Sequence, residues 1–175
     1  MPPSPDSLTF EQAIELTHSL LDQLEQNTLS EAEVEAAIVN LVSSENGARG
    51  FFVNYLPDPR SFADDPSDAV VQALRTSPAI VADLMAKNLA MSTAMAIHHR
   101  RQQNEELVQG SDRVRSRSLQ LIQRLQLPEM QDKLQQLQES LTTGIGSYQA
   151  FLDRWGYDAE QRGAIAAAVQ QVLEH

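Results

Sequence analysis

The sequence predicts an all-α fold: a helical bundle of seven or eight helices, with a central Ala/Met-rich helix and an acidic N-terminal helical hairpin. Apolar residues recur every three or four positions along most of the chain, which is the period of an amphipathic helix. Serine, threonine, aspartate and proline stand where helices would begin, and glycine stands where several would end. Residues 51–56 have the composition of a strand, but no second strand is available to pair with them.

The predicted hairpin occupies residues 9–46. At each of its two helix starts, a hydroxyl residue is followed three positions later by glutamine or glutamate, which is the pattern of a capping box. Three residues join the two helices, a length that places them side by side and antiparallel. The helices are predicted over 10–26 and 31–45. Residues 1–8 are expected to form a disordered N-terminal tail.

The segment after the hairpin contains two glycines followed by three aromatic residues. Gly47-Ala48-Arg49-Gly50 interrupts the helical pattern and is interpreted as a turn. Residues 51–56 could form a helix or a strand, and a short helix is favoured because a lone strand would leave its backbone groups unpaired. Beyond an acidic, proline-containing loop, Asp65 can cap another short helix, with Pro66 at its first position.

Ser77-Pro78 begins the longest predicted helix. Alanines and methionines make residues 78–97 apolar on nearly all sides, which places this helix at the centre of the bundle. The pattern meets no breaker before Gly110, and a straight helix over 78–127 would extend roughly 75 Å. A compact chain of this length has a radius of gyration of about 16 Å. The segment is therefore predicted to bend near Gly110, or else to project and meet a second copy.

Three further helices complete what is predicted to be a single domain over residues 9–175. A proline begins the first, glycines end the first and second, and an aspartate–glutamine capping box begins the third. These signals are Pro128, Gly144, Gly156, and Asp158 with Gln161. The second of these helices is predicted over 147–155, and the third over 159–174.

The composition excludes several classes of site. The chain carries 24 acidic and 13 basic residues, a formal net charge of −11, which disfavours nonspecific binding of the whole surface to nucleic acid or anionic lipid. It has no cysteine, so disulfides, thiolate metal sites and cysteine nucleophiles are excluded. Asp83, Lys87 and Asn88 interrupt the apolar segment 79–97, which is therefore interpreted as a core helix and not as a membrane span.

Charge is unevenly distributed along the chain. Residues 1–48 contain nine acidic residues and no lysine or arginine, whereas six arginines lie between positions 100 and 124. Helical spacing places Arg113, Arg117 and Arg124 on one flank. This flank could bind phosphates or an acidic protein surface. For the arginines taken alone, the favoured interpretation is a solvated helix face whose arginines pair with carboxylates of the same chain.

Tryptophan, tyrosine and arginine are the residues that the centres of protein interfaces prefer. An aromatic group near the C-terminus contains the one tryptophan of the chain. The candidate interaction residues are Arg100, Arg101, Arg113, Arg117, Arg124 and Trp155. No catalytic residue, cofactor or metal ligand is predicted, because the sequence has neither an H-E-x-x-H motif nor a G-x-S-x-G elbow. We therefore do not expect an enzyme.

Three stretches resemble those of small uncharacterised all-helical proteins from cyanobacteria: GFFVNYL at 50–56, KNLAMSTAMA at 87–96 and FLDRWGYD at 151–158. The glutamine-rich region 120–138 has the same character. The resemblance covers roughly residues 8–170. It implies a soluble cytoplasmic protein, and it transfers no catalytic or binding residue to this chain.

Three functions are compatible with these features. The leading hypothesis is a non-enzymatic adaptor or assembly protein, a homodimer whose arginine flank meets an acidic surface such as the 1–46 hairpin of a second copy. Another hypothesis is nucleic-acid binding through the arginines, which is disfavoured because residues 98–127 contain no aromatic ring except two histidines. The alternative to both is a bundle that binds an apolar or pigment-like molecule in a pocket near Phe52, Tyr55, Met91, Met95 and Trp155.

Overall fold

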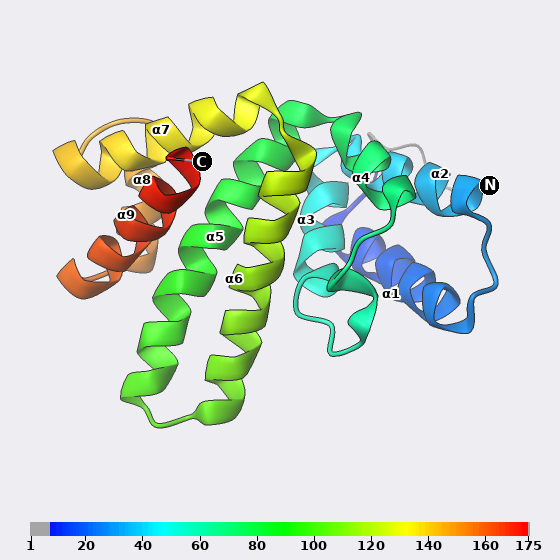
Figure 1. The fold of residues 1–175 in the computed structure, drawn as a ribbon, viewed down its shortest axis with the longest axis horizontal. Coiled ribbons are helices and arrows are strands. Elements are labelled where there is room, and N and C mark those ends of the chain that lie inside the picture. Colours follow the sequence, from blue (N-terminus) through cyan, green and yellow to red (C-terminus); the bar gives the residue numbers. More distant parts are fainter. Residues whose placement is uncertain (1–7, 175) are drawn as a thin grey trace. The chain divides into compact units, whose positions relative to one another are not determined.

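The structure is a computed structural model that describes residues 8–174. Within this range the chain forms nine α-helices and one short 3-10 helix, and it forms no strand (Figure 1). The predicted all-α class is confirmed, with more helices than the seven or eight expected. The predicted disordered tail over residues 1–8 lies outside the described residues, apart from Leu8, which is buried.

The chain divides into two compact units, Met1–Leu84 and Met85–His175. The boundary falls inside helix α5 (Pro78–Arg101), so this helix contributes to both units. The sequence predicts a single domain because no proline- or glycine-rich linker marks this boundary. A helix that passes from one unit to the next leaves no such compositional signal.

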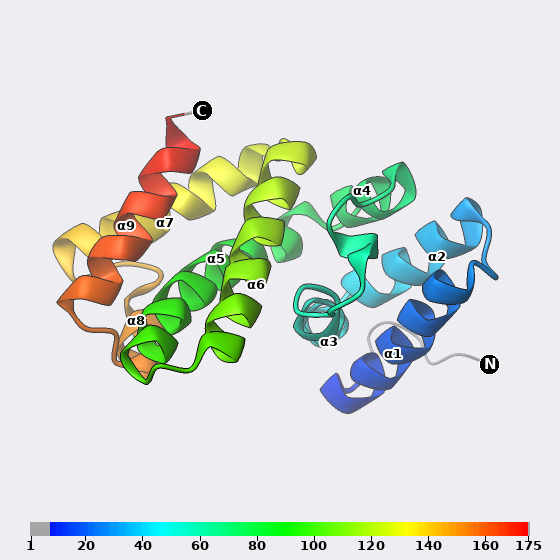
Figure 2. The same cartoon turned by 60° about the horizontal axis from the view of Figure 1, so that its bottom comes forward.

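The first unit contains four α-helices and the 3-10 helix. Their bounds are α1 Phe10–Gln26, α2 Glu31–Val42, α3 Glu45–Tyr55, η2 Ser61–Ala63 and α4 Asp68–Arg75. Both predicted capping boxes are present, at Thr9 with Gln12 and at Ser30 with Glu33. The two helices of the predicted hairpin pack on other helices more than on each other, since α1 packs mainly against α3 and α2 against α3 and α4 (Figure 2).

The prediction of a turn at residues 47–50 is wrong, because these residues lie inside α3. The two glycines serve close helix packing instead. A Cβ atom on Gly50 would lie 2.5 Å from the Cβ of Ala13 on α1, and one on Gly47 would lie 1.9 Å from the carbonyl oxygen of Leu41. A side chain at either position would push the neighbouring backbone away.

Residues 51–55 are helical, as favoured, and they form the aromatic core of the first unit. The rings of Phe51 and Tyr55 stack with centroids 4.8 Å apart, and Phe52 meets Phe51 edge-on at 5.1 Å. The predicted cap at Asp65 is wrong. Ser67 caps α4 instead, since its hydroxyl accepts a hydrogen bond from the backbone N–H of Val70.

The second unit contains the rest of α5 and four further helices. These are α6 Glu105–Leu125, α7 Pro128–Thr143, α8 Gln149–Trp155 and α9 Ala159–Leu173. Figures 1 and 2 show α5 and α6 side by side and antiparallel, and α7 packs against α8 and α9. The Ala/Met-rich helix is buried as predicted: Met85, Ala86, Leu89, Ala90 and Ala94 are inaccessible to solvent.

The chain reverses at residues 102–104 and not near Gly110, which lies inside α6, so the predicted position of the bend is wrong. Gln103 adopts a left-handed backbone conformation with φ of 58°. The side chain of Asn104 then caps α6 by accepting a hydrogen bond from the N–H of Leu107. A glycine within a packed helix costs only about 1 kcal/mol relative to alanine, so Gly110 does not end the helix.

The helix boundaries of the C-terminal segment are close to the predicted ones. Pro128 is in the first turn of α7, and Gly144 and Gly156 cap α7 and α8 in the left-handed conformation. Asp158 and Gln161 form the predicted capping box of α9. The buried side chain of Gln161 also donates a hydrogen bond of 3.1 Å to the carbonyl oxygen of Ala94, which joins α9 to α5.

Candidate functional site

Two of the predicted interaction residues, Arg100 and Arg101, lie at the C-terminal end of α5 and form ion pairs within the second unit. Nη2 of Arg100 lies 3.1 Å from Oδ2 of Asp112 on α6. Arg101 contacts the start of α9, with Nη1 at 2.6 Å from Oδ2 of Asp158 and Nη2 at 2.7 Å from Oε1 of Glu160. Both arginine side chains keep about half of their surface exposed, so their charge is only partly used by these contacts.

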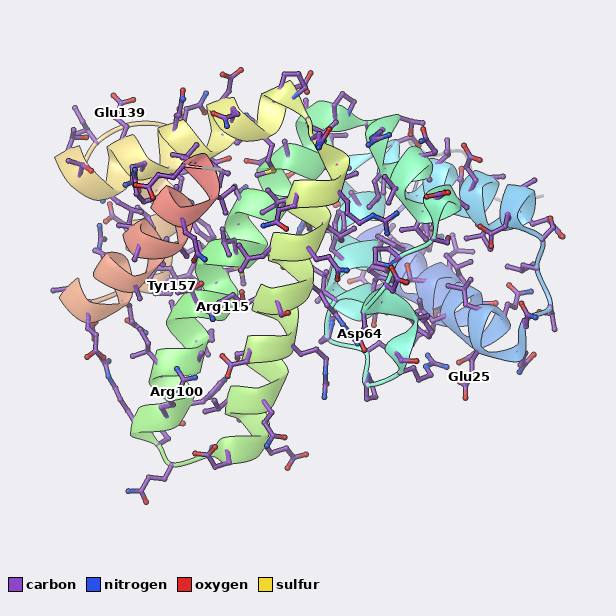
Figure 3. All side chains as sticks on the ribbon, viewed as in Figure 1. Glu25, Asp64, Arg100, Arg115, Glu139 and Tyr157 are labelled. Atoms are coloured by element: carbon purple, nitrogen blue, oxygen red, sulfur yellow. The ribbon has the colours of Figure 1, made fainter. Side chains whose placement is uncertain are left out.

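The predicted flank of Arg113, Arg117 and Arg124 is not an open surface strip. All three residues lie on α6, but Arg117 is only 3% exposed, and Arg113 and Arg124 are half-buried. The exposed arginine of this helix is Arg115, which helical spacing excludes from the flank. Figure 3 labels Arg115 together with Arg100. A buried guanidinium such as that of Arg117 cannot serve as a primary contact for an external partner.

The net negative charge of the protein lies entirely in the first unit. Residues 1–84 contain fourteen acidic residues and three arginines, a net charge of −11, whereas residues 85–175 contain ten acidic and ten basic residues. The outer positions of α1 and α2 carry most of the exposed carboxylates of the first unit. The excess of carboxylates therefore lies in the first unit, while the second unit carries the majority of the arginines.

One arginine that the sequence reasoning missed already binds the acidic surface of α1. Nη1 of Arg60 lies 3.1 Å from Oδ1 of Asp22 and also contacts the carboxylate of Glu25. Its Nη2 lies 2.9 Å from Oδ2 of Asp58. The hydrogen bond to Asp58, followed by that to Glu25, raises the pKa of the Arg60 guanidinium. The carboxylates of α1 are thus spaced to accept a guanidinium group.

Trp155 is half-exposed at the end of α8, at 49% of its possible surface. The guanidinium carbon of Arg154, also exposed, lies 5.7 Å from the centre of the tryptophan ring, within the range of a cation–π contact. The opposite side of α8 is anchored in the core, where Leu152 is fully buried. Trp155 and Arg154 therefore lie on the exposed side of a short helix that Leu152 anchors.

The segment after α8 connects Arg154 and Trp155 to Arg101. Burial raises the pKa of the neighbouring Tyr157 to about 12, so this phenol stays protonated at physiological pH. The hydrogen bond from Arg101, together with that from the backbone of Gln161, lowers the pKa of Asp158. We call Arg101, Arg154 and Trp155 the α8 corner, because Arg101 binds Asp158 and Glu160 at the start of α9, the helix that follows α8 after a short connection.

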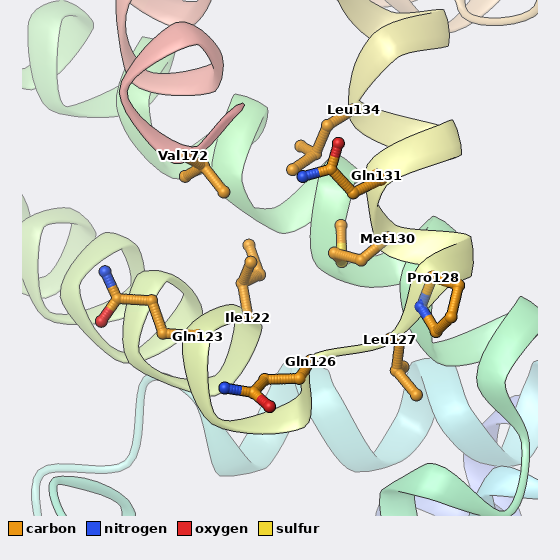
Figure 4. A pocket seen from close by; sticks show the side chains of 9 residues that line it. All are labelled: Ile122, Gln123, Gln126, Leu127, Pro128, Met130, Gln131, Leu134 and Val172. Atoms are coloured by element: carbon orange, nitrogen blue, oxygen red, sulfur yellow. The ribbon is translucent and has the colours of Figure 1, made fainter. Parts of the chain in front are cut away.

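A separate pocket of about 540 Å³ lies within the second unit, where α6 ends and α7 begins (Figure 4). Its lining residues come from α6, α7 and α9: Ile122, Gln123, Gln126, Leu127, Pro128, Met130, Gln131, Leu134 and Val172. None of the residues of the predicted apolar pocket is among them. Phe52 and Tyr55 are buried in the core of the first unit, and Met91 and Met95 are half-buried on α5.

Residues 8–174 contain no group of three or more histidine, aspartate or glutamate side chains that could hold a metal ion. Among the described helices, α5 is the one long and apolar enough to cross a membrane by length and composition. Its most apolar window is 61% buried within the protein, as in a core helix.

Comparison with known proteins places the chain in a family. A search of curated proteins finds no match, and neither does a search of solved structures. A family model described as "Uncharacterised conserved protein UCP020893" matches residues 9–172, nearly the whole chain. The protein therefore belongs to the family of the uncharacterised conserved protein UCP020893.

Proposed function

We propose that the protein is a non-enzymatic adaptor or assembly protein that self-associates as a homodimer. In the proposed dimer, the α8 corner of one copy contacts the acidic outer surface of α1 and α2 in the other. The observation that carries this proposal is the half-exposed Trp155 ring with the Arg154 guanidinium within cation–π distance of it. Tryptophan and arginine are the residue types that most often supply the binding energy of protein interfaces.

The distribution of charge supports the choice of an acidic partner surface. The first unit has a net charge of −11, and residues 1–48 contain no lysine or arginine that could compete for its carboxylates. Arg60 provides a precedent within the chain, because its guanidinium binds Asp22 and Glu25 on α1. Those two carboxylates keep more than half of their surface exposed, so the same helix can accept further cations.

The proposed surface differs from the arginine flank expected from the sequence. Arg117 is buried, and Arg113 and Arg124 are half-buried, so they are left out of it. Arg101 stays in the surface because it is half-exposed and binds Asp158, in the short connection between α8 and α9. Nucleic-acid binding is not proposed, because residues 98–127 contain no aromatic ring except two histidines and because Arg117 is buried.

Size-exclusion chromatography with light scattering tests the proposal. We expect a dimer at about 50 mM salt that dissociates toward a monomer at about 500 mM salt, since screening weakens contacts between exposed charges. Trp155→Ala should weaken the dimer. Ile145→Ala is the matched control, because Ile145 is an even more exposed apolar residue of the same unit, at 69%. A monomer at every concentration and salt would rule out the homodimer.

We also propose a cytoplasmic location and a cyanobacterial source. The absence of cysteine, which is usual in a reducing compartment, supports the location. The resemblance of the three quoted stretches supports the source. Fractionation of the native cell with an antibody against the protein would test the location, and recovery in the membrane pellet would contradict it.

A further inference from the structure

We propose that the pocket between α6, α7 and α9 binds an uncharged, largely apolar small molecule with one polar end. This inference goes beyond the proposed dimer and is independent of it, because no residue of the α8 corner lines the pocket. The pocket volume of about 540 Å³ falls within the range of small-molecule sites in proteins. All of its lining residues belong to the second unit.

The floor of the pocket is apolar. Figure 4 shows Ile122 from α6, Met130 and Leu134 from α7, and Val172 from α9 pointing toward a common space. Three of these side chains are at most 5% exposed, and only Val172 is more open. Methionine is unbranched and flexible, so Met130 can adapt to the shape of a ligand. An apolar ligand would replace water against this floor.

The rim of the pocket is polar but carries no charge. Gln123, Gln126 and Gln131 are exposed lining residues, and their carboxamides can both donate and accept hydrogen bonds. None of the nine lining residues is ionisable, although 37 of the 175 residues of the chain are charged. A charged ligand would lose hydration here without gaining a counter-ion. The lining therefore favours a neutral molecule whose polar end lies among the glutamines.

The backbone at the rim is also unusual. Gln126 has φ of 48° and ψ of 45°, a left-handed conformation that a residue with a side chain adopts only when its surroundings require it. It is imposed by a connection of two residues between the end of α6 at Leu125 and the start of α7 at Pro128. The tight corner holds the glutamine rim and the apolar floor together, so the pocket is preformed.

Titration with Nile red, an uncharged apolar dye whose fluorescence rises in apolar sites, tests this inference. We expect saturable binding of one dye per chain. Val172→Trp should fill the pocket and weaken binding about tenfold or more. Gln171→Trp is the matched control, because Gln171 is the exposed neighbour of Val172 on α9 and does not line the pocket. Circular dichroism checks that each variant is folded.

A second pair of variants keeps the test decisive if Val172→Trp fails to fold. Gln131→Trp introduces the same bulk at an exposed rim position, and Asp132→Trp is its exposed control outside the lining. Binding that is lost in the lining variants and kept in the controls supports the site. Absence of saturable binding to the wild type overturns it, as does equal binding by lining and control variants. The anionic dye anilinonaphthalene sulfonate should bind more weakly than Nile red, and stronger binding would contradict a neutral ligand.

Discussion

Gly50→Ala tests whether the glycines of α3 serve helix packing. The new Cβ would lie 2.5 Å from the Cβ of Ala13, 3.0 Å from its carbonyl carbon and 3.0 Å from the backbone nitrogen of Ile14. Two of these three atoms belong to the backbone of α1, so no side-chain rotation can relieve the overlap. Ordinary contacts begin at 3.4 Å, and α1 must therefore move away from α3.

The expected magnitude follows from two opposing effects. Overpacking of a core contact costs about 1–3 kcal/mol. The substitution also gains helix propensity, which offsets up to about 1 kcal/mol of that cost. We therefore expect Gly50→Ala to lower the free energy of unfolding by roughly 1–2 kcal/mol. Gly163→Ala on α9 is the control: its Cβ would meet no atom within 4 Å, so it should be neutral or stabilising.

Urea unfolding followed by far-ultraviolet circular dichroism measures both variants. Trp155 fluorescence reports the second unit separately, and this signal should shift less in Gly50→Ala, because Gly50 lies in the first unit. Adding Ala13→Gly should rescue Gly50→Ala in part, because the closest contact is removed while the two backbone contacts remain. If Gly50→Ala and Gly163→Ala shift the midpoint in the same direction by the same amount, the packing argument is refuted.

Further predictions concern polar contacts. Gln161→Ala should destabilise the protein by roughly 1–2 kcal/mol in urea unfolding, because it removes the buried hydrogen bond to Ala94 and half of the capping box; an unchanged midpoint would contradict this. Glu33 accepts hydrogen bonds from the backbone and side chain of Ser30, which lower its pKa below the ordinary value of 4.5. A group whose pKa is lowered by folding contributes stability above its unfolded pKa and loses it as pH falls through the folded value. The stability difference between wild type and Glu33→Gln should therefore be constant from neutral pH to about 5 and shrink below about 4.5; a difference that grows on acidification would exclude this linkage. Asp158→Asn, which keeps a capping side chain but weakens the contact with Arg101, should behave in the same way around the ordinary aspartate value of 3.8.

The local signals in the sequence predicted most helix starts correctly. Thr9, Ser30, Asp158 and Pro128 all begin helices where they were expected, because capping depends on residues only three positions apart. Helix ends were predicted correctly where glycine caps them, as at Gly144 and Gly156, and also at Gln26, whereas the second helix ends at Val42 and not at residue 45. The reversal at 102–104 depends on a left-handed glutamine, a residue that gives no signal of a break.

Features that depend on distant parts of the chain could not be predicted from local patterns. Glycine marks both turns and close helix contacts, and only the approach of Ala13 shows that Gly50 belongs to the second kind. The spacing of Arg117 places it on a helix flank but does not reveal that it is buried. The pocket requires α6, α7 and α9 together, and Val172 is 50 residues from Ile122 in the sequence.

A charge-exchange experiment tests the proposed dimer most directly. Arg154→Glu changes the sign of charge at the α8 corner, and Glu11→Lys with Glu15→Lys changes it at two exposed positions of α1. Each variant alone places like charges across both contacts of the dimer and should be monomeric by light scattering at low salt. Their equimolar mixture should form a heterodimer, because one contact is then native and the other has both charges exchanged. A mixture that remains monomeric while the wild type dimerises would show that these two surfaces do not meet.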